Sequence, residues 1–432
     1  MEVLLLIIFA LGYLAIAFEH PLRVNKSATA LITGVLCWTV YILYNQSPEG
    51  VALVDGQLKH HLSEIAGILF FLLGAMTVVE LIDAHEGFEV ITSRIRTTNK
   101  RKLFVIVGVV AFFLSAVLDN LTTAIVMVTL VRRLLSDRED KLLFCGLVVI
   151  AANAGGAWSP IGDVTTTMLW ISGRITTVNI ILKLILPSLV CFVVPLLVLL
   201  PRLKGNLPAA ATVAPANGVS TPRERNIVFF SGLIILLLVP VFKTLTHLEP
   251  YMGILLGLGV LWLITEILHK MKNDEEKHQL SVAHALRRID TPSVLFFFGI
   301  LAAVSALQST GMLSSFAQWM NDTIGNLDVI TISFGLSSAV VDNVPLVAAA
   351  QGMYPLAESG AFMQDGYFWE FLAYCAGTGG SILIIGSAAG VAAMGLEKID
   401  FIWYLKKISL AALLGYFAGA FVYIGMERLL HG

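Results

Sequence analysis

The sequence is dominated by long apolar runs that contain no charged side chain. A helix needs about 20 mostly apolar residues to cross about 30 Å of hydrocarbon, because each residue adds about 1.5 Å. Extended by flanking polar residues, the runs predict ten membrane crossings. The runs are 3–18, 27–48, 65–79, 142–162, 184–201, 226–242, 250–265, 291–321, 371–396 and 408–426. We therefore expect an all-α polytopic membrane protein.

The composition excludes several other classes of protein. Only 13% of the residues are charged, against about 25% in a typical soluble domain, which excludes an ordinary soluble enzyme and a disordered chain. The formal net charge is −2, so we expect no nucleic-acid partner. All four cysteines lie in apolar stretches and are expected to be packing residues, not a disulfide framework. The expected surroundings are a lipid bilayer.

Two further apolar stretches are each interrupted by an Asp-Asn pair. The pairs are Asp119-Asn120 within 103–131 and Asp342-Asn343 within 329–357. Each half holds about 12–16 residues, which is too short for a crossing. The first stretch has basic residues at both ends, whereas the second has none nearby. The two ends of each stretch are therefore expected on the same side of the membrane. We interpret them as re-entrant helical hairpins, the first entering from the cytoplasm and the second from outside.

The distribution of basic residues predicts the orientation. Lysine and arginine accumulate in short cytoplasmic loops. With ten crossings and two returning hairpins, the great majority of the 28 basic residues fall on one side and only four on the other. That side is taken as the cytoplasm of a bacterial-type inner (plasma) membrane, with both termini outside. A signal peptide is the alternative for the first run, although its leading residues are acidic, not basic.

The two halves of the chain repeat one another. Residues 115–120 match 338–343 at five of six positions, and three glycines of 155–162 recur 224 residues later. Each half holds three crossings, a hairpin and two further crossings, and since five is odd the second copy is expected upside down. Inverted repeats with interrupted helices are typical of secondary transporters, whose site lies near the midplane. The expected parts are a first repeat 1–201, a cytoplasmic linker 202–225 and a second repeat 226–432.

Each repeat also contains a glycine-rich segment that is expected to unwind. Segment 153–163 holds three glycines and Pro160, and segment 377–386 holds four glycines, residues that disfavour a regular helix. Unwound backbone at membrane depth is tolerated only where it lines a cavity or is buried in protein. We expect broken helices over 142–170 and 371–396, whose free carbonyls suit a hard cation. Close helix packing is the alternative role for these glycines.

Three carboxylates are predicted to lie deep in the membrane: Asp119, Asp163 and Asp342. Ionisable groups at that depth are costly and are functional candidates by default. Helix capping is the alternative for Asp119 and Asp342. Asp163 aligns with Ser387, so only one repeat supplies a titratable group at this position. Competition between Na⁺ and H⁺ for the carboxylates would produce exchange if access to the site alternates.

Neutral groups close to these carboxylates in sequence are candidate oxygen ligands. The predicted Na⁺/H⁺ site consists of Asp119, Asn120, Thr122, Thr123, Asn153, Gly155, Asp163, Thr165, Asp342, Asn343, Thr378, Ser381 and Ser387. The predicted sodium ligands among them are Asp119, Asn120, Asn153, Asp342 and Asn343. The alternative for each hydroxyl is a hydrogen bond to its own helix backbone. No cofactor is expected besides the transported ions.

Asp83 and His85 form a candidate pH-sensing pair at the predicted cytoplasmic end of the third crossing. Histidine titrates near neutrality, so a small change in its surroundings moves its charge across the physiological range. The alternative is a pair of solvated interfacial groups.

These motifs resemble those of the NhaD-type sodium/proton antiporters of the ion transporter superfamily. The matching segments are 19–26, 118–123, 153–166, 341–344 and 377–387. The resemblance implies export of Na⁺ and Li⁺ in exchange for H⁺, and a homodimer with a static scaffold domain and a moving transport domain. It also implies functional polar groups at Asp119, Asn120, Asn153, Asp163, Asp342 and Ser387. The second hairpin departs from the first, because Pro345 stands where Thr122 does.

The leading alternative is a sodium-coupled carboxylate or other anion permease of the same fold. Relatives that transport carboxylates typically carry Ser-Asn-Thr at the hairpin tips, whereas both tips here carry Asp-Asn and no arginine lies near them. An intramembrane aspartyl protease would need Tyr-Asp and Gly-x-Gly-Asp motifs, which the sequence lacks, so we expect no enzyme. A channel would differ by conducting an uncoupled, non-saturating flux.

Overall fold

The computed structural model describes the chain except residues 18, 23, 96, 204, 207–219 and 432. Throughout that described part the regular elements are helices and no strand is present, which confirms the all-α prediction. The part of the predicted linker at 204 and 207–219 lies outside the described residues.

The helices before residue 204 follow one another with short connections. They are α1 (Glu2–Ala17), α2 (Glu19–Leu22), α3 (Lys26–Leu43), α4 (Pro48–Ala84), α5 (Glu89–Thr92), α6 (Lys100–Leu118), α7 (Asn120–Leu134), α8 (Arg138–Ala157), α9 (Val164–Ile171), α10 (Thr177–Leu199) and the 3₁₀ turn η1 (Leu200–Arg202).

The helices after residue 219 complete the fold. They are α11 (Pro222–Thr246), α12 (Pro250–Leu268), α13 (Asp274–Leu280), α14 (Val282–Arg288), α15 (Thr291–Ser309), α16 (Met312–Ile324), α17 (Leu327–Ser337), α18 (Asn343–Met353), α19 (Tyr367–Gly379), α20 (Ala388–Glu397), α21 (Phe401–Lys407) and α22 (Ser409–His431).

Among the described residues, nine helices are long and apolar enough to cross a bilayer. They are α3, α4, α6, α8, α10 with η1, α11, α12, α15 and α22. The chain is therefore a multi-pass membrane protein. The first predicted crossing forms the shorter helix α1, and the predicted crossing 371–396 is divided between α19 and α20, both shorter than a full span.

Two sequence-based boundaries were wrong. The run 291–321 is not one helix, because Gly311 adopts a positive φ of 75° that ends α15 and precedes α16. The first arm of the first hairpin is longer than predicted. It begins at Lys100, where the Asn99 side chain accepts a hydrogen bond from the Lys102 N–H, and so reaches 19 residues.

The interruptions that the sequence predicted are present. The break between α6 and α7 is a single residue, Asp119, whose φ is 99°, and the break between α17 and α18 covers residues 338–342. A second pair of breaks separates α8 from α9 and α19 from α20. The first of these starts later than expected, at Trp158, so Asn153 and Gly155 lie in regular helix α8.

The glycines near these breaks permit close packing of helices. A Cβ on Gly155 would lie 2.0 Å from the Phe112 carbonyl oxygen on α6, and a Cβ on Gly379 would lie 2.0 Å from the Gly335 oxygen on α17. A glycine therefore allows close approach of α8 to α6 and, in the other half of the chain, of α19 to α17. This is the packing role that the sequence left as an alternative.

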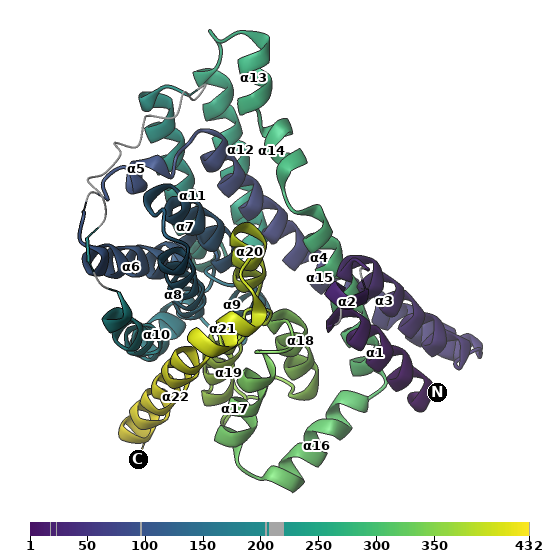
Figure 1. Ribbon diagram of the computed structural model, residues 1–432. Coiled ribbons are helices and arrows are strands. Elements are labelled where there is room, and N and C mark those ends of the chain that lie inside the picture. Colours follow the sequence, from purple (N-terminus) through teal and green to yellow (C-terminus); the bar gives the residue numbers. More distant parts are fainter. Residues whose placement is uncertain (18, 23, 96, 204, 207–219, 432) are drawn as a thin grey trace.

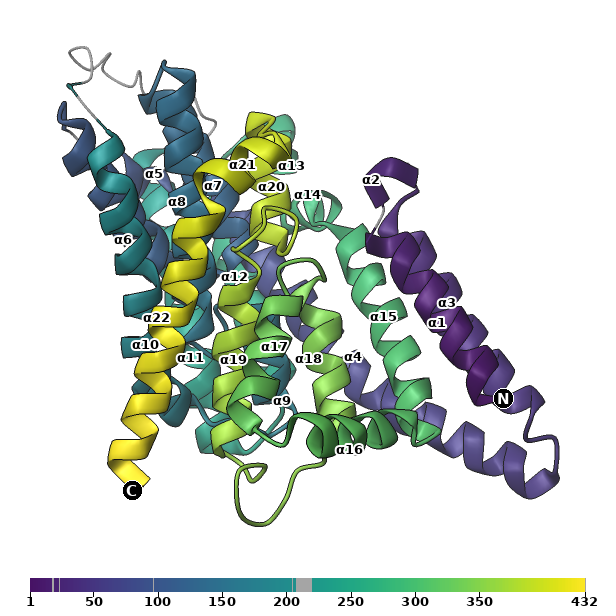
Figure 2. The same ribbon diagram turned by 60° about the horizontal axis from the view of Figure 1, so that its bottom comes forward.

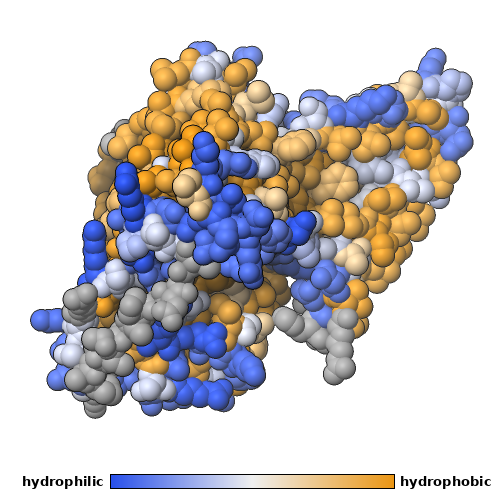
Figure 3. Space-filling model, turned by 90° about the horizontal axis from the view of Figure 1, so that it is seen from above, coloured by the Kyte–Doolittle hydropathy of each residue, from blue (hydrophilic) through white to orange (hydrophobic). Residues whose placement is uncertain are grey.

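The helices are arranged in two lobes. Figure 1 shows α1, α3, α15 and the N-terminal part of α4 projecting to the right, while α6–α10 and α17–α22 form the larger lobe. Figure 2 shows α6 and α7 in the upper half and α17 and α18 in the lower half, with both termini toward the end opposite α5 and α13. Seen from above, hydrophilic residues are concentrated in the middle of the face and the projecting lobe is mostly hydrophobic (Figure 3).

Candidate functional site

Asp163 lies at the centre of a buried polar cluster. It follows the break in the first repeat and is the N-cap residue of α9, with 1% of its surface exposed. Its Oδ1 accepts hydrogen bonds from the Thr165 backbone N–H at 2.8 Å and from the Thr165 hydroxyl at 2.7 Å. The predicted contribution of Thr165 is therefore a direct contact with the carboxylate. An Asp at an N-cap satisfies free helix N–H groups and is stabilised by the positive end of the helix dipole.

Both hairpin tips reach the same carboxylate. The Asn120 side-chain amide donates to Asp163 Oδ2 at 2.6 Å, and the Asn343 amide lies 3.3 Å from both Asp163 oxygens. Asn120 begins α7 and Asn343 begins α18, so the two donors come from opposite halves of the chain. The structure thus brings together two Asp-Asn motifs that are separated by more than half of the sequence.

Asn153 links the two broken helices. Its side-chain oxygen accepts a hydrogen bond from Asn120 at 3.1 Å, and its amide donates to the Ser387 hydroxyl at 2.9 Å. Ser387 is the N-cap residue of α20, the position that corresponds to Asp163 in the other repeat. The equivalent titratable and neutral residues of the two repeats therefore belong to one continuous network through Asn120 and Asn153.

Asp119 and Asp342 also cap helices, yet they differ in their partners. Asp119 accepts hydrogen bonds from the Thr122 backbone N–H and hydroxyl, both at 2.8 Å, which explains the prediction of Thr122 as a site residue. Asp342 has only a 3.3 Å contact with the Val344 N–H from its own helix. Its second oxygen lies 3.4 Å from the Lys26 ammonium.

The Thr123 side chain differs from the other hydroxyl groups near the cluster in its hydrogen bonding. Its hydroxyl is buried and has no hydrogen-bond partner within the described residues. A buried polar atom without a partner is costly, and such an atom is often explained by an ion or water that occupies the site. The Thr123 oxygen is thus available as a ligand one residue after Thr122.

Two candidate ligands donate their hydroxyl protons to the backbone of α19, Thr378 from within that helix and Ser381 from just beyond its end. The Thr378 hydroxyl donates to the Tyr374 carbonyl oxygen at 2.6 Å, and the Ser381 hydroxyl donates to the Thr378 carbonyl oxygen at 2.7 Å. Both hydroxyl protons are therefore used locally. Gly155, also predicted at the site, lies in helix α8 and serves the close packing described above.

The cluster contains oxygen ligands and neutral donors in place of basic side chains. In the part of the chain that the structure describes, neither Asp163 nor Asp119 forms an ion pair with lysine or arginine. Carboxylate, amide and hydroxyl oxygens are the ligands that hard cations prefer. A buried carboxylate held only by neutral groups can be balanced by a proton or by a metal cation.

The two candidate pH-sensing residues, Asp83 and His85, have different partners in the structure. His85 is buried beyond the end of α4, with Nδ1 2.7 Å from the Leu81 oxygen and Nε2 3.0 Å from Nε2 of His269. Asp83 points instead toward Arg288, at 3.7 Å. Burial lowers the pKa of His85 to about 4. His269, the partner that the sequence did not suggest, lies more than 180 residues away.

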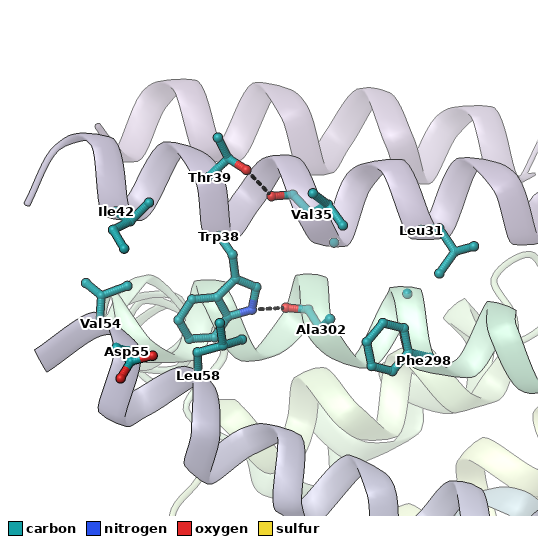
Figure 4. Close-up of a pocket in the computed structure, with 12 residues that line it drawn as sticks. Leu31, Val35, Trp38, Thr39, Ile42, Val54, Asp55, Leu58, Phe298 and Ala302 are labelled. Carbon is teal, nitrogen blue, oxygen red and sulfur yellow. Dashed lines mark hydrogen bonds between the residues drawn. The ribbon is translucent and has the colours of Figure 1, made fainter. Parts of the chain in front are cut away.

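A separate apolar cleft of about 340 Å³ lies between α3, α4 and α15. Figure 4 shows its lining, with the Trp38 indole N–H donating to the Ala302 carbonyl oxygen at 2.9 Å across the cleft. Of the carboxylates, only Asp55 lines it, and none of the predicted site residues does. The polar cluster around Asp163, not this cleft, is therefore the candidate site.

Comparison with known proteins identifies related transporters. The family model described as "Citrate transporter" matches residues 4–369. Sodium/proton antiporter 1 of Arabidopsis thaliana is 49% identical over 430 residues, which cover 99% of this chain and 73% of that protein. Sodium/proton antiporter 2 of the same plant is 47% identical over 425 residues, which cover 98% of this chain and 99% of that protein.

A bacterial relative is also similar to this chain over nearly its whole length, at lower sequence identity. The Na⁺/H⁺ antiporter NhaD of Vibrio cholerae is 32% identical over 437 residues, which cover 95% of this chain and 89% of that protein. The similarity includes every segment that forms the polar cluster, because it extends over nearly all of both chains. The chain belongs to the NhaD family of sodium/proton antiporters within the ion transporter superfamily.

Proposed function

We propose that this chain is a secondary active transporter that exports Na⁺, and also Li⁺, in exchange for H⁺ by alternating access. The observation that carries the proposal is Asp163, a buried carboxylate that accepts hydrogen bonds from both hairpin tips and has no basic partner among the described residues. The carboxylate needs one positive charge for balance, and either a proton or a hard cation supplies it. If each displaces the other, every exchange moves the two ions in opposite directions.

The proposed ligands of Na⁺ are the oxygens of this cluster. Asp163 and Asn153 lie within the hydrogen-bonded network, the buried Thr123 hydroxyl follows Asn120 by three residues in α7, and Asp119 and Asp342 are the carboxylates of the two tips. Asn120 and Asn343 hold Asp163 in place through their amides and keep their own side-chain oxygens for the ion. Four helices, α7, α9, α18 and α20, begin at the cluster, and their positive ends help to retain ionised carboxylates.

The proposal includes a finer architecture for the multi-pass fold. Two inverted repeats, 1–201 and 226–432, would each contribute one re-entrant hairpin and one broken helix, with both termini outside the cytoplasm. Matching breaks at Asp119 and 338–342 and matching glycine contacts at Gly155 and Gly379 support this assignment. A homodimer is proposed from the resemblance, with the lobe of α1, α3 and α15 as the static part and the hairpins as the moving part.

The chemistry of the site disfavours the anion permease. The ionised carboxylates of Asp119 and Asp163, which have no lysine or arginine partner among the described residues, would repel a carboxylate substrate. Lys26 does bring an ammonium to the second tip, but it is already paired with Asp342.

The test is Na⁺-dependent proton movement in proteoliposomes that carry a preformed pH gradient. Addition of Na⁺ or Li⁺ should dissipate the gradient, and K⁺ or citrate should not. Asp163→Asn should reduce the response to background, because the amide cannot exchange a proton or balance a cation. Asp55→Asn is the matched control, since Asp55 contacts Lys59 on an exposed part of α4. Full exchange by the Asp163 variant, or coupling to citrate, would contradict the proposal.

A further inference from the structure

Lys26 brings a positive charge to the tip of the second hairpin. Its ammonium lies 3.4 Å from Asp342 Oδ2, and the two side chains are 25% and 17% exposed. Lys26 is the first residue of α3, in the projecting lobe, whereas Asp342 caps α18, more than 300 residues later. The ion pair therefore connects the α3–α15 lobe with the hairpin that contributes Asn343 to the site.

The position of Lys26 is fixed by the lobe from which it projects. Its ammonium lies 4.6 Å from the centre of the Phe296 ring on α15, a favourable cation–π contact. The neighbouring Ser27 hydroxyl donates to the Pro292 carbonyl oxygen at 2.6 Å. Farther along, a Cβ on Gly34 would lie 2.5 Å from the Gly299 carbonyl oxygen. Because α3 and α15 pack this closely, the ammonium is held by a rigid pair of helices.

Asp342 has fewer local partners than Asp119. The Thr122 hydroxyl and N–H both donate to Asp119, but the matching position in the second hairpin is Pro345, which has neither donor. The Oδ2 atom of Asp342 therefore has no donor from α18, and its partner is the Lys26 ammonium of α3. The position that corresponds to Lys26 in the second repeat is Pro250, so the repeat supplies no such cation to Asp119.

We propose that the Lys26 ammonium is a built-in competitor of the transported cation. In the ion-free arrangement it occupies Asp342, and Na⁺ that approaches the tip takes its place. Partly exposed ion pairs contribute little net free energy, so a bound metal ion can displace the ammonium. Lys26 is thus a positioning residue that sets the affinity for Na⁺ and couples ion binding to the contact between the lobe and the second hairpin.

This inference rests on the proposed Na⁺/H⁺ exchange, and its first test measures the concentration dependence of that exchange. Lys26→Met keeps the length of the side chain and removes its charge. We expect the half-saturating Na⁺ concentration to fall about fivefold, the effect of removing an ion pair worth about 1 kcal/mol. Lys26→Arg should keep the original value because it preserves the charge. Lys59→Met, which removes an exposed lysine paired with Asp55, is the matched control.

A second test uses the unsubstituted protein and does not depend on how the variants fold. Acetylation of individual lysines is followed by mass spectrometry in Na⁺ and in an equal concentration of choline. Na⁺ should increase the acetylation of Lys26, since the displaced ammonium loses its carboxylate partner, and should leave Lys59 unchanged. In Asp342→Asn, acetylation of Lys26 should be high in both salts.

The outcomes separate this inference from the proposed function. A half-saturating Na⁺ concentration of the Lys26→Met variant that equals or exceeds that of the Lys59→Met control would overturn the inference. Equal acetylation of Lys26 in Na⁺ and choline would do so as well. Absence of any Na⁺-dependent proton movement in the unsubstituted protein would instead contradict the proposed exchange.

Discussion

At the scale of single residues, Asp163 shows how a carboxylate is accommodated within a membrane protein. Removing an ionised carboxylate from water costs several kcal/mol, and here no basic residue of the described chain compensates for it. Two asparagine amides and two groups of Thr165 donate to it instead, at the positive end of α9. These neutral contacts orient the carboxylate without cancelling its charge, as the proposed exchange of a proton for a metal cation requires.

The Thr123 hydroxyl provides a prediction at this scale. Thr123→Val keeps the shape of the side chain and removes an oxygen that has no partner within the described residues. We expect thermal stability in detergent to be unchanged and the half-saturating Na⁺ concentration to rise by about tenfold, the equivalent of about 1.4 kcal/mol. Thr378→Val is the contrasting variant, because it removes a bond to the Tyr374 oxygen and should lower stability with little effect on Na⁺. Unchanged Na⁺ dependence of the Thr123 variant would exclude its hydroxyl as a ligand.

At the scale of secondary-structure elements, the site depends on where helices are interrupted. α7, α9, α18 and α20 each begin at a polar N-cap, namely Asp119, Asp163, Asp342 and Ser387. Their N–H groups satisfy buried side chains that an uninterrupted helix could not reach. The glycines allow the broken helices to approach the hairpins, which positions these N-termini against one another.

Gly155 provides the prediction at the scale of elements. The Cβ of Gly155→Ala would be 2.0 Å from the Phe112 carbonyl oxygen, a backbone atom that cannot move without displacing α6. We expect a loss of stability of about 3 kcal/mol, at the upper end of the usual cost of overpacking a core, and less folded protein by size-exclusion chromatography than for the unsubstituted chain. Gly395→Ala in α20 has no atom within 4 Å of the new Cβ, so it should fold normally. Normal folding of the Gly155 variant would show that α6 and α8 are not held in this contact.

At the scale of the whole molecule, two lobes meet across the second hairpin. The lobe of α1, α3 and α15 presents Lys26 to Asp342, and the larger lobe holds the polar cluster. The amides of Asn120, at the start of α7, and Asn343, at the start of α18, both reach Asp163. Relative movement of the lobes would therefore change the contact between Lys26 and Asp342 without separating the asparagines from Asp163.

The proposed topology predicts which loops are accessible from each side. Single cysteines are introduced by Glu358→Cys, between α18 and α19, and by Glu275→Cys, in α13. The four native cysteines are buried and should give a low background. A membrane-impermeant thiol reagent should label position 358 in intact cells, and position 275 only after permeabilisation. Labelling of both positions in intact cells would contradict an inverted arrangement of the two repeats.

The sequence by itself determined the helical membrane-spanning class, the positions of the interruptions and the polar residues beside them. These features depend on local chemistry: the length of apolar runs, the conformational preferences of glycine and proline, and the capping ability of Asp and Ser. Two local expectations were not met. Asn153 and Gly155 were expected in the unwound segment but lie in helix α8, which continues to Ala157. The apolar run 291–321 was expected to form one helix but is divided at Gly311, which adopts a positive φ.

Only the tertiary structure decided which of the polar groups meet. Asn153 bonds Ser387, Lys26 pairs with Asp342, and His85 stacks on His269, each across a separation that no local pattern encodes. Likewise, Thr123 and Thr378 are both threonines beside predicted site residues, but packing leaves one hydroxyl unpartnered among the described residues and turns the other to its own helix. The direction and burial of a side chain depend on how distant helices pack, and that packing is what brings separate polar motifs into one buried cluster.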